Sequence, residues 1–141
     1  MDQDKIRIII VDDHQMIRET WKMILQRDER LNIIGECGSG AEAIDMAALL
    51  LPDVILMDIN MSPINGFEAT KKIVTLHPTI KVIGISINNL PSYARNMIQM
   101  GAKGYVTKNS SKEEMLQAIM TVCNGGTYLC KEIEEKMTEN S

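Results

Sequence analysis

Four short apolar segments, each followed by polar residues, constrain the fold of this chain more than any other feature. The clearest one starts at Val54 and stops at a single carboxylate, Asp58. Short apolar segments bounded by turn residues are typical of buried strands in a parallel sheet. The polar residues after the four segments are Asp12 and Asp13, Asp58, Ser86 and, following Thr107, Lys108. Because carboxyl ends of parallel strands share one edge, where open α/β sheets bind ligands, we expect these side chains to converge.

Helical patterns fill the intervals between the strands. Apolar spacing and capping residues predict five helices, over residues 14–26, 39–51, 67–77, 91–101 and 111–123. Ser39 and Ser111 each precede a Glu by three residues, which is the capping-box pattern. Phe67, Thr70 and Val74 are expected to form the inner face of the third helix. The alternation predicts an α/β fold of (βα)5 type, with a short second strand around residues 33–34.

Composition and charge narrow the class of protein. A length of 141 residues with 45% hydrophobic content suits one compact domain. The formal net charge of -4, with no dense Lys/Arg cluster, argues against direct nucleic-acid binding. No apolar run approaches the roughly 20 residues that span a bilayer, and no signal-peptide pattern is present, so we expect a cytoplasmic protein without a membrane partner. The three cysteines form no metal-binding pattern and are expected to be reduced thiols.

The predicted sheet edge carries the residue types that phosphoryl transfer needs. Carboxylates at Asp12, Asp13 and Asp58 would repel one another at close range, and a hard divalent cation such as Mg2+ relieves that repulsion. With Asp13 and Asp58 as ligands, the metal could neutralise a phosphoryl group, and Asp58 is the candidate nucleophile. Lys108 could then pair with one phosphoryl oxygen while Ser86 donates to another.

Each of these residues also has a simpler interpretation. Asp12 and Asp13 could only cap the first helix, whose N-terminus favours negative charge. Lys108 could be a solvated charge, and Ser86 could be an ordinary turn residue. The two histidines are assigned to helix ends, because neither ends a strand.

Together, the motifs resemble a known family. They are Val-Asp-Asp-His at 11–14, Leu-Met-Asp-Ile-Asn-Met at 56–61, Gly-Ile-Ser at 84–86 and Gly-Ala-Lys-Gly-Tyr-Val-Thr-Lys at 101–108. This set resembles the receiver domain of bacterial two-component response regulators, over residues 5 to about 123. The Asp-Asp-His opening and Gly-Gly-Thr-Tyr-Leu at 125–129 resemble the NarL/FixJ (LuxR-type) subfamily, whose receivers usually precede a helix-turn-helix DNA-binding domain.

The resemblance implies roles for individual residues. Asp58 would accept a phosphoryl group from a sensor histidine kinase. Mg2+ would be bound by Asp13, Asp58 and the backbone carbonyl of Asn60, with Asp12 acting through water. Lys108 would be the phosphate partner. Such a domain is a regulatory phosphoacceptor and not an enzyme in the ordinary sense, since it catalyses only its own phosphotransfer and autodephosphorylation.

The resemblance also implies a fold and a switch. The family fold is a flavodoxin-like three-layer sandwich around a parallel sheet of order 2-1-3-4-5. Ser86 and Tyr105 would form the switch pair: phosphate on Asp58 would draw the Ser86 hydroxyl toward it, leaving space that the Tyr105 ring can fill. Two packings of one side chain make a bistable element.

The domain limits follow from the same comparison of motifs. Residues 1–126 would be the receiver, and 127–141 a connector leading to a helix-turn-helix output domain that lies outside this chain. The residues after Tyr128 are expected to make one short exposed helix or to fray. DNA would be bound only through the output domain. Phosphorylation-dependent homodimers could form through the first and fifth helices or through the face beside Tyr105.

Two other classes of protein remain as alternatives. A hydrolase of the haloacid dehalogenase type also forms an aspartyl phosphate, but it needs a second Asp where this chain has Asn60. A flavodoxin-like cofactor-binding protein would need a phosphate-cradling loop after the first strand. Asp12 and Asp13 stand there and would repel a phosphate.

The chain departs from the family pattern after Asp58. Ser62 stands at a position that is usually proline, and Pro63 follows, so the loop is expected to bend differently. Asn65 replaces the usual Asp before Gly66 and should preserve the turn.

Overall fold

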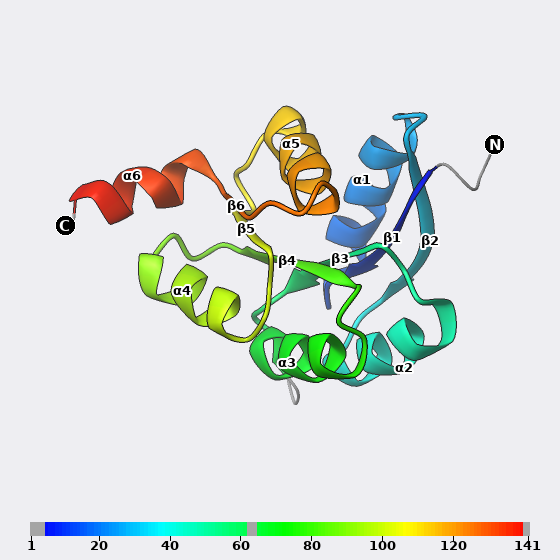
Figure 1. Ribbon diagram of the computed structural model, residues 1–141. Coiled ribbons are helices and arrows are strands. Elements are labelled where there is room, and N and C mark those ends of the chain that lie inside the picture. Colours follow the sequence, from blue (N-terminus) through cyan, green and yellow to red (C-terminus); the bar gives the residue numbers. More distant parts are fainter. Residues whose placement is uncertain (1–4, 62–64, 140–141) are drawn as a thin grey trace.

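The computed structural model describes residues 5–61 and 65–139 and consists of a parallel sheet with helices on both faces (Figure 1). α1 and α5 lie on one face, and α2, α3 and α4 lie on the other. The elements are β1 (Ile6–Val11), α1 (Gln15–Gln26), β2 (Leu31–Cys37), α2 (Gly40–Leu50), β3 (Val54–Asp58), α3 (Gly66–Leu76), β4 (Lys81–Ser86), α4 (Pro91–Gln99), β5 (Gly104–Thr107), α5 (Lys112–Cys123), β6 (Tyr128–Leu129) and α6 (Lys131–Glu139).

The sheet has the strand order β2-β1-β3-β4-β5-β6, and every pairing is parallel. The predicted order of the first five strands is therefore confirmed, while β6 was not predicted. β3 lies in the interior of the sheet and all five of its residues are buried. Asp58 pairs in register with Ile85, and Ser86 with Thr107, so the carboxyl ends of three strands lie side by side.

Local capping explains where two of the helices begin. The Ser39 hydroxyl accepts a hydrogen bond from the backbone N–H of Glu42 at 3.1 Å and donates to its carboxylate at 3.2 Å, so Ser39 caps the helix together with the predicted Glu. Ser111 likewise accepts from the N–H of Glu114 at 3.1 Å. The Glu114 carboxylate accepts from the Tyr128 hydroxyl at 3.0 Å, which links the start of α5 to β6.

The predicted inner face of α3 is partly wrong. Ala69, Thr70 and Ile73 are fully buried, whereas Phe67 and Val74 lie at the edge of the core. The ring of Phe67 stacks instead on Tyr93 of α4, with ring centroids 6.1 Å apart. The helix is rotated relative to the prediction because an apolar side chain at its margin packs on the neighbouring helix α4 and not on the sheet.

A short C-terminal helix forms, as one of the two expectations for this segment had it, but one side of the helix is not exposed. α6 forms, but it packs against α4, and Cys130 and Ile133 are fully buried (Figure 1). Pairing of β6 with β5 carries the chain along the sheet and leaves the apolar side of α6 facing the protein. Burying one such side chain stabilises the docked helix by about 1.5–3 kcal/mol.

The turn between β3 and α3 requires a glycine. A Cβ atom at Gly66 would lie 2.5 Å from the carbonyl oxygen of Asp58, so no other residue fits without moving the backbone. Asn65 caps α3 by accepting from the N–H of Glu68 at 2.9 Å, as its turn chemistry indicated. The expectation for Ser62 and Pro63 lies outside the described residues.

Two expectations from composition can be compared with the structure. The three cysteines are free thiols. Within residues 5–61 and 65–139, no helix has the length and apolar character needed to cross a bilayer.

Replacing Gly66 by Ala tests the close approach beneath Asp58. We expect Gly66→Ala to lower the free energy of unfolding by about 2–3 kcal/mol, because backbone must move to admit the methyl group. Gly125→Ala is the matched control: its φ of 90° strains an alanine, but nothing lies within 4 Å of the added Cβ. That variant should lose only about 1 kcal/mol in urea unfolding, and equal losses would contradict the steric argument.

Candidate functional site

An acidic cluster lies at the carboxyl edge of the sheet. Ligand atoms of Asp12, Asp13, His14 and Asp58 all lie within 4.8 Å of one another. The three carboxylates were predicted to converge, and they do. His14 was assigned only to a helix end; it is the N-cap residue of α1, and its Nδ1 also lies 2.9 Å from Asp13 Oδ1 and 3.2 Å from Asp12 Oδ1. The only sequence signal that His14 would belong to the acidic cluster was its position next to the two aspartates.

The alternative role of Asp12 and Asp13 as helix caps is not supported. Asp12 Oδ1 accepts from the backbone N–H of His14 at 2.9 Å, a local turn that precedes the helix. Asp12 is buried, while the side chain of Asp13 is 42% exposed. The cluster therefore has an inner carboxylate and an outer one that solvent reaches.

Asp58 carries a buried carboxylate that is incompletely compensated. The residue is 1% exposed, and its Oδ1 accepts from the backbone N–H of Asn60 at 3.0 Å. Its Oδ2 has no hydrogen-bond partner. Burial is the main cause that raises the pKa of Asp58, and the charges of Asp12 and Asp13 add to it, whereas the Asn60 hydrogen bond and Lys108 act in the opposite direction. An oxygen in this state is available to a cation or an electrophile.

Lys108 is an internal partner of the carboxylates. Its Nζ lies 3.2 Å from Asp12 Oδ2 and 3.6 Å from Asp58 Oδ2, and its side chain is 14% exposed. The end of β5 positions it, since the Lys108 N–H donates to the Ser86 carbonyl at 2.8 Å. The simpler interpretation of Lys108 as a solvated charge is therefore wrong.

Ser86 ends β4 and is fully buried, so it is not an ordinary turn residue. Its hydroxyl donates to the side-chain oxygen of Asn60 at 2.8 Å and accepts from the N–H of Asn88 at 2.9 Å. The contact of the Asn60 side chain with Ser86 was not predicted. No local pattern indicates it, because the two residues are 26 positions apart.

Tyr105 is also fully buried, and its ring packs beside Gly84. Its hydroxyl donates to the carbonyl of Asn88 at 2.9 Å. Burial raises the pKa of Tyr105 to about 12, so the hydroxyl remains a donor at neutral pH. Ser86 and Tyr105 thus hold the same loop residue, one through its N–H and the other through its carbonyl.

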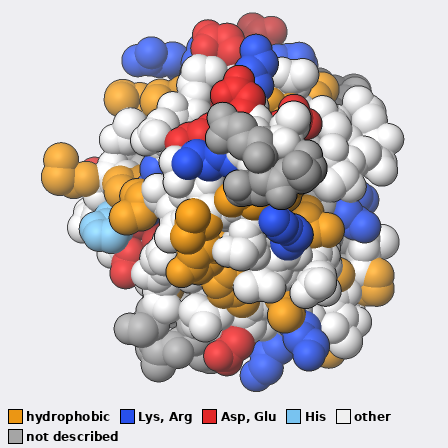
Figure 2. Space-filling model, turned by 90° about the vertical axis from the view of Figure 1, so that its left-hand side faces the viewer, with side chains coloured by type: hydrophobic (Ala, Val, Ile, Leu, Met, Phe, Trp, Pro, Cys, Tyr) orange, Lys and Arg blue, Asp and Glu red, His pale blue; other side chains and the backbone are white. Residues whose placement is uncertain are grey.

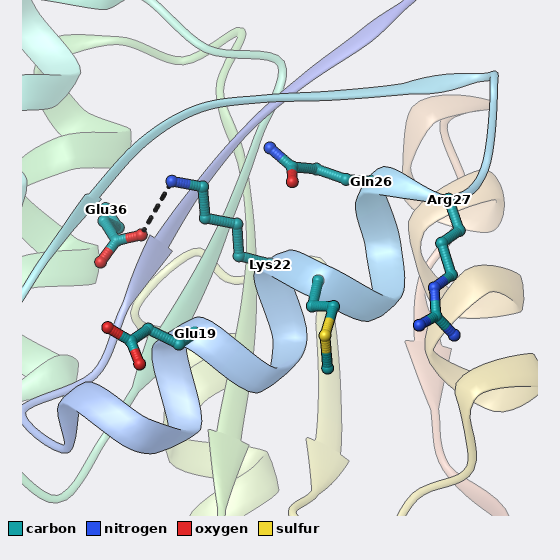
Figure 3. A pocket seen from close by; sticks show the side chains of 6 residues that line it. Glu19, Lys22, Gln26, Arg27 and Glu36 are labelled. Atoms are coloured by element: carbon teal, nitrogen blue, oxygen red, sulfur yellow. Dashed lines mark ion pairs between the residues drawn. The ribbon is translucent and has the colours of Figure 1, made fainter.

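A basic residue of α1 supports the first loop of the site. Arg18 Nη1 donates to the carbonyl of Asp12 at 2.6 Å, and its Nε donates to Glu36 at 3.3 Å. Glu36 also pairs with Lys22 at 3.5 Å, across a depression between α1 and β2 (Figure 3). The depression is lined by Glu19, Lys22, Met23, Gln26, Arg27 and Glu36, none of which belongs to the acidic cluster. Sequence reasoning missed Arg18, because only the fold brings it to the Asp12 carbonyl.

Comparison with known families agrees with this geometry. Residues 8–120 match the family described as the response regulator receiver domain. The chain belongs to this family, and the resemblance inferred from its motifs is confirmed. It is a receiver domain of the kind found in two-component response regulators, which are regulatory proteins.

Curated relatives extend beyond this chain. The transcriptional regulatory protein DegU of Brevibacillus brevis is 36% identical over 140 residues, which is 99% of this chain and 58% of DegU. The response regulator GacA of Pseudomonas viridiflava is 37% identical over 136 residues, which is 96% of this chain and 64% of GacA. The chain therefore spans less than two thirds of the length of these relatives.

Solved structures share the fold. A two-component response regulator of the LuxR family from Aurantimonas sp. SI85-9A1 superimposes with a TM-score of 0.92 at 27% identity, covering 96% of this chain and 97% of that chain. The flavodoxin-like receiver fold is thereby confirmed. The matches support the receiver interpretation and neither the haloacid dehalogenase nor the cofactor-binding alternative.

The raised pKa of Asp58 predicts that this charge destabilises the metal-free protein. A carboxyl group whose pKa is higher in the folded state binds its proton more tightly there, so ionisation at neutral pH costs stability. We expect Asp58→Asn without divalent cation to gain on the order of 1 kcal/mol, or about 3–5 °C in Tm.

The sign of this effect depends on pH. The gain should be largest at neutral pH and should shrink as pH falls through the raised pKa, where wild-type Asp58 becomes protonated. Asp45→Asn, on the exposed side of α2, serves as the control and should leave Tm unchanged. A lower Tm for Asp58→Asn than for wild type at pH 7 would contradict the expectation.

Proposed function

We propose that this chain is the phosphoacceptor of a two-component signalling pathway, with Asp58 accepting a phosphoryl group from a sensor histidine kinase. The observation that carries the proposal is the buried Asp58 Oδ2, which has no hydrogen-bond partner and lies 3.6 Å from Lys108 Nζ. A nucleophile needs such a free oxygen, and the negative charge of the transferred phosphoryl group needs such a cation. To reach the phosphorylated histidine of such a kinase, the protein would have to be in the cytoplasm.

The acidic cluster fits a Mg2+ ion. Hard oxygen ligands suit this ion, and Asp58 Oδ2 is a buried oxygen without a partner. Asp13 and Asp58 would supply carboxylates, Asn60 its backbone carbonyl, and Asp12 would act through water. The exposed Asp13 side chain gives solvent access to the site. When bound, Mg2+ would neutralise both the carboxylates and the phosphoryl oxygens.

The chemistry at Asp58 is a direct displacement. One carboxylate oxygen forms a bond to phosphorus while the bond from phosphorus to the kinase imidazole nitrogen breaks, and the electron pair stays on that nitrogen. Lys108 neutralises a phosphoryl oxygen from its position beside Asp12 and Asp58. Hydrolysis of the resulting acyl phosphate by water resets the domain. The domain catalyses only these two steps on itself.

The switch is proposed to lie in the hydrogen bonds of Ser86. Its hydroxyl has a single hydrogen, which is donated to Asn60 at 2.8 Å and would be donated to a phosphoryl oxygen after transfer. The Tyr105 ring is already fully buried beside the loop. The proposed switch therefore does not require the ring to move in from an exposed position. What changes is the hold that Ser86 and Tyr105 together have on Asn88.

The output is proposed to lie beyond this chain. Residues 1–126 would form the receiver and 127–141 a connector to a helix-turn-helix domain, through which alone DNA is bound. DegU, which is longer than this chain, is named a transcriptional regulatory protein. Phosphorylation-dependent homodimers would use the groove between α1 and the start of α5, where Ile17, Trp21 and Ile24 are only partly buried. The alternative face beside Tyr105 is covered in part by α6.

Phosphorylation of Asp58 can be measured directly. Incubation with a small phosphodonor and Mg2+ should add the mass of one phosphoryl group to the wild-type chain, with the label on the peptide that contains Asp58. Asp58→Asn preserves the shape of the side chain but removes the nucleophile, and it should remain unmodified. Transfer of one phosphoryl group to Asp58→Asn under the same conditions would refute the assignment.

Mg2+ should stabilise the fold, since a ligand that binds only the native state adds stability by mass action. At 100 times the dissociation constant the gain is about 2.7 kcal/mol. Asp13→Asn removes one carboxylate and should shift the Mg2+ titration of Tm to higher concentration. The metal assignment fails if both proteins show the same rise in Tm at every Mg2+ concentration.

A further inference from the structure

The C-terminal segment is fastened to the part of the receiver next to the acidic cluster. β6 extends the sheet beside β5, and the Cys130 N–H donates to the Tyr105 carbonyl at 3.1 Å. α6 then packs against α4, with Cys130 and Ile133 fully buried. Figure 2 looks onto this side of the molecule, where hydrophobic and charged side chains lie next to one another.

Glu132 joins α6 to two separate elements. Its Oε2 accepts from Asn89 Nδ2 at 2.7 Å, and its Oε1 accepts from the Thr107 hydroxyl at 2.9 Å. Asn89 belongs to the loop between β4 and α4, whereas Thr107 ends β5. These two hydrogen bonds are the main reason that the pKa of Glu132 lies below its usual value, with burial opposing. Both carboxylate oxygens are therefore committed, and Glu132 bridges loop and strand as an ionised group.

Both donors adjoin residues of the phosphoacceptor site. Thr107 immediately precedes Lys108 and pairs in register with Ser86. Asn89 follows Asn88, whose N–H donates to the Ser86 hydroxyl at 2.9 Å. Ser86 is therefore connected to both donors to Glu132: it pairs directly with Thr107, and it bonds the residue next to Asn89.

The loop between β4 and α4 is built to rearrange at low cost. Ile87 and Leu90 are 76% and 50% exposed, so these large apolar side chains contribute little packing. The contacts that hold the loop are largely side-chain hydrogen bonds to Ser86, Tyr105 and Glu132. Segments with little buried apolar contact open with small free energies.

We propose that α6 is a latch: Glu132 closes it while Asp58 is unmodified, and it opens when Ser86 turns its hydroxyl to a phosphoryl oxygen. This inference rests on the proposed function of Asp58. Movement of Asn88 with Ser86 carries Asn89 along, and Glu132 cannot keep both bonds when its two donors, which lie on different elements, separate. Because such coupling is reciprocal, the closed latch also holds the site in its unphosphorylated arrangement.

The accessibility of Cys130 reports whether the latch is closed. Its side chain is fully buried, and the residue joins β6 to α6. In the unmodified full chain, Glu132→Gln should raise the rate at which a small alkylating reagent modifies Cys130 by about tenfold, which corresponds to about 1.4 kcal/mol. Glu135→Gln makes the same charge change at an exposed position of α6 and should leave the rate unchanged. Buried Cys37 serves as an internal control for global unfolding.

Phosphorylation supplies the second comparison. In wild-type protein whose phosphoryl group is verified by mass, Cys130 should be modified several-fold faster than in the unphosphorylated protein. Glu132→Gln should in turn hold a larger phosphorylated fraction at a given donor concentration. Hydrogen exchange of the amides of residues 133–138 should rise in parallel with Cys130 modification.

Distinct outcomes separate the latch from the function on which it rests. Equal Cys130 rates in Glu132→Gln and Glu135→Gln, or an unchanged rate in verified phosphorylated protein, would overturn the latch while phosphorylation stands. Absence of any phosphoryl transfer would overturn the proposed function and the switching together. In that case the comparison of the two glutamine variants would still show whether Glu132 fastens α6.

Discussion

Burial of the Asp58 carboxylate sets the conditions that the rest of the structure has to meet. β3 is buried along its whole length, so the charge at its end is largely shielded from bulk water. An ionised group in such a position is tolerated only with hydrogen bonds or opposite charge nearby. The Asn60 N–H provides a hydrogen bond and Lys108 provides an opposite charge, but Asp58 Oδ2 still has no hydrogen-bond partner. A cation or a phosphoryl group at this edge of the sheet would relieve that residual imbalance, which is the basis of the function proposed for Asp58.

The same edge is connected to the C-terminus through side chains. Ser86 touches Asn60 on one side and Asn88 on the other, and the loop that contains Asn88 continues to the contact with Glu132. These are directional bonds between groups with few hydrogens to donate, so a new acceptor at Asp58 must displace an existing one. Apolar packing of α6 on α4, by contrast, stabilises the docked helix in proportion to the buried area and depends little on orientation. In the proposed latch, this packing keeps the helix docked while the hydrogen bonds of Glu132 make its position sensitive to the loop that contains Asn88.

Family membership explains some of these features better than others. The match over residues 8–120 covers the five strands and the acidic cluster. The family match stops before β6 and α6, whereas the similarity to DegU covers 99% of this chain and so extends into the segment that contains Glu132 and Ile133. DegU and GacA are both longer than this chain, which covers 58% and 64% of them.

The sequence by itself determined the first five strands, their polar ends and most helix starts, but not β6. Apolar runs such as the one before Asp58, and capping residues such as Ser39, act over a few positions and need no knowledge of the fold. The convergence of the three carboxylates followed from the strand ends, whereas tertiary structure alone decided the other contacts between distant side chains. Asn89 and Thr107 reach Glu132 from 43 and 25 positions away, and the Asn60 side chain reaches Ser86 from 26. Periodicity states which side of an element is apolar, but its rotation and its partners depend on how neighbouring elements pack.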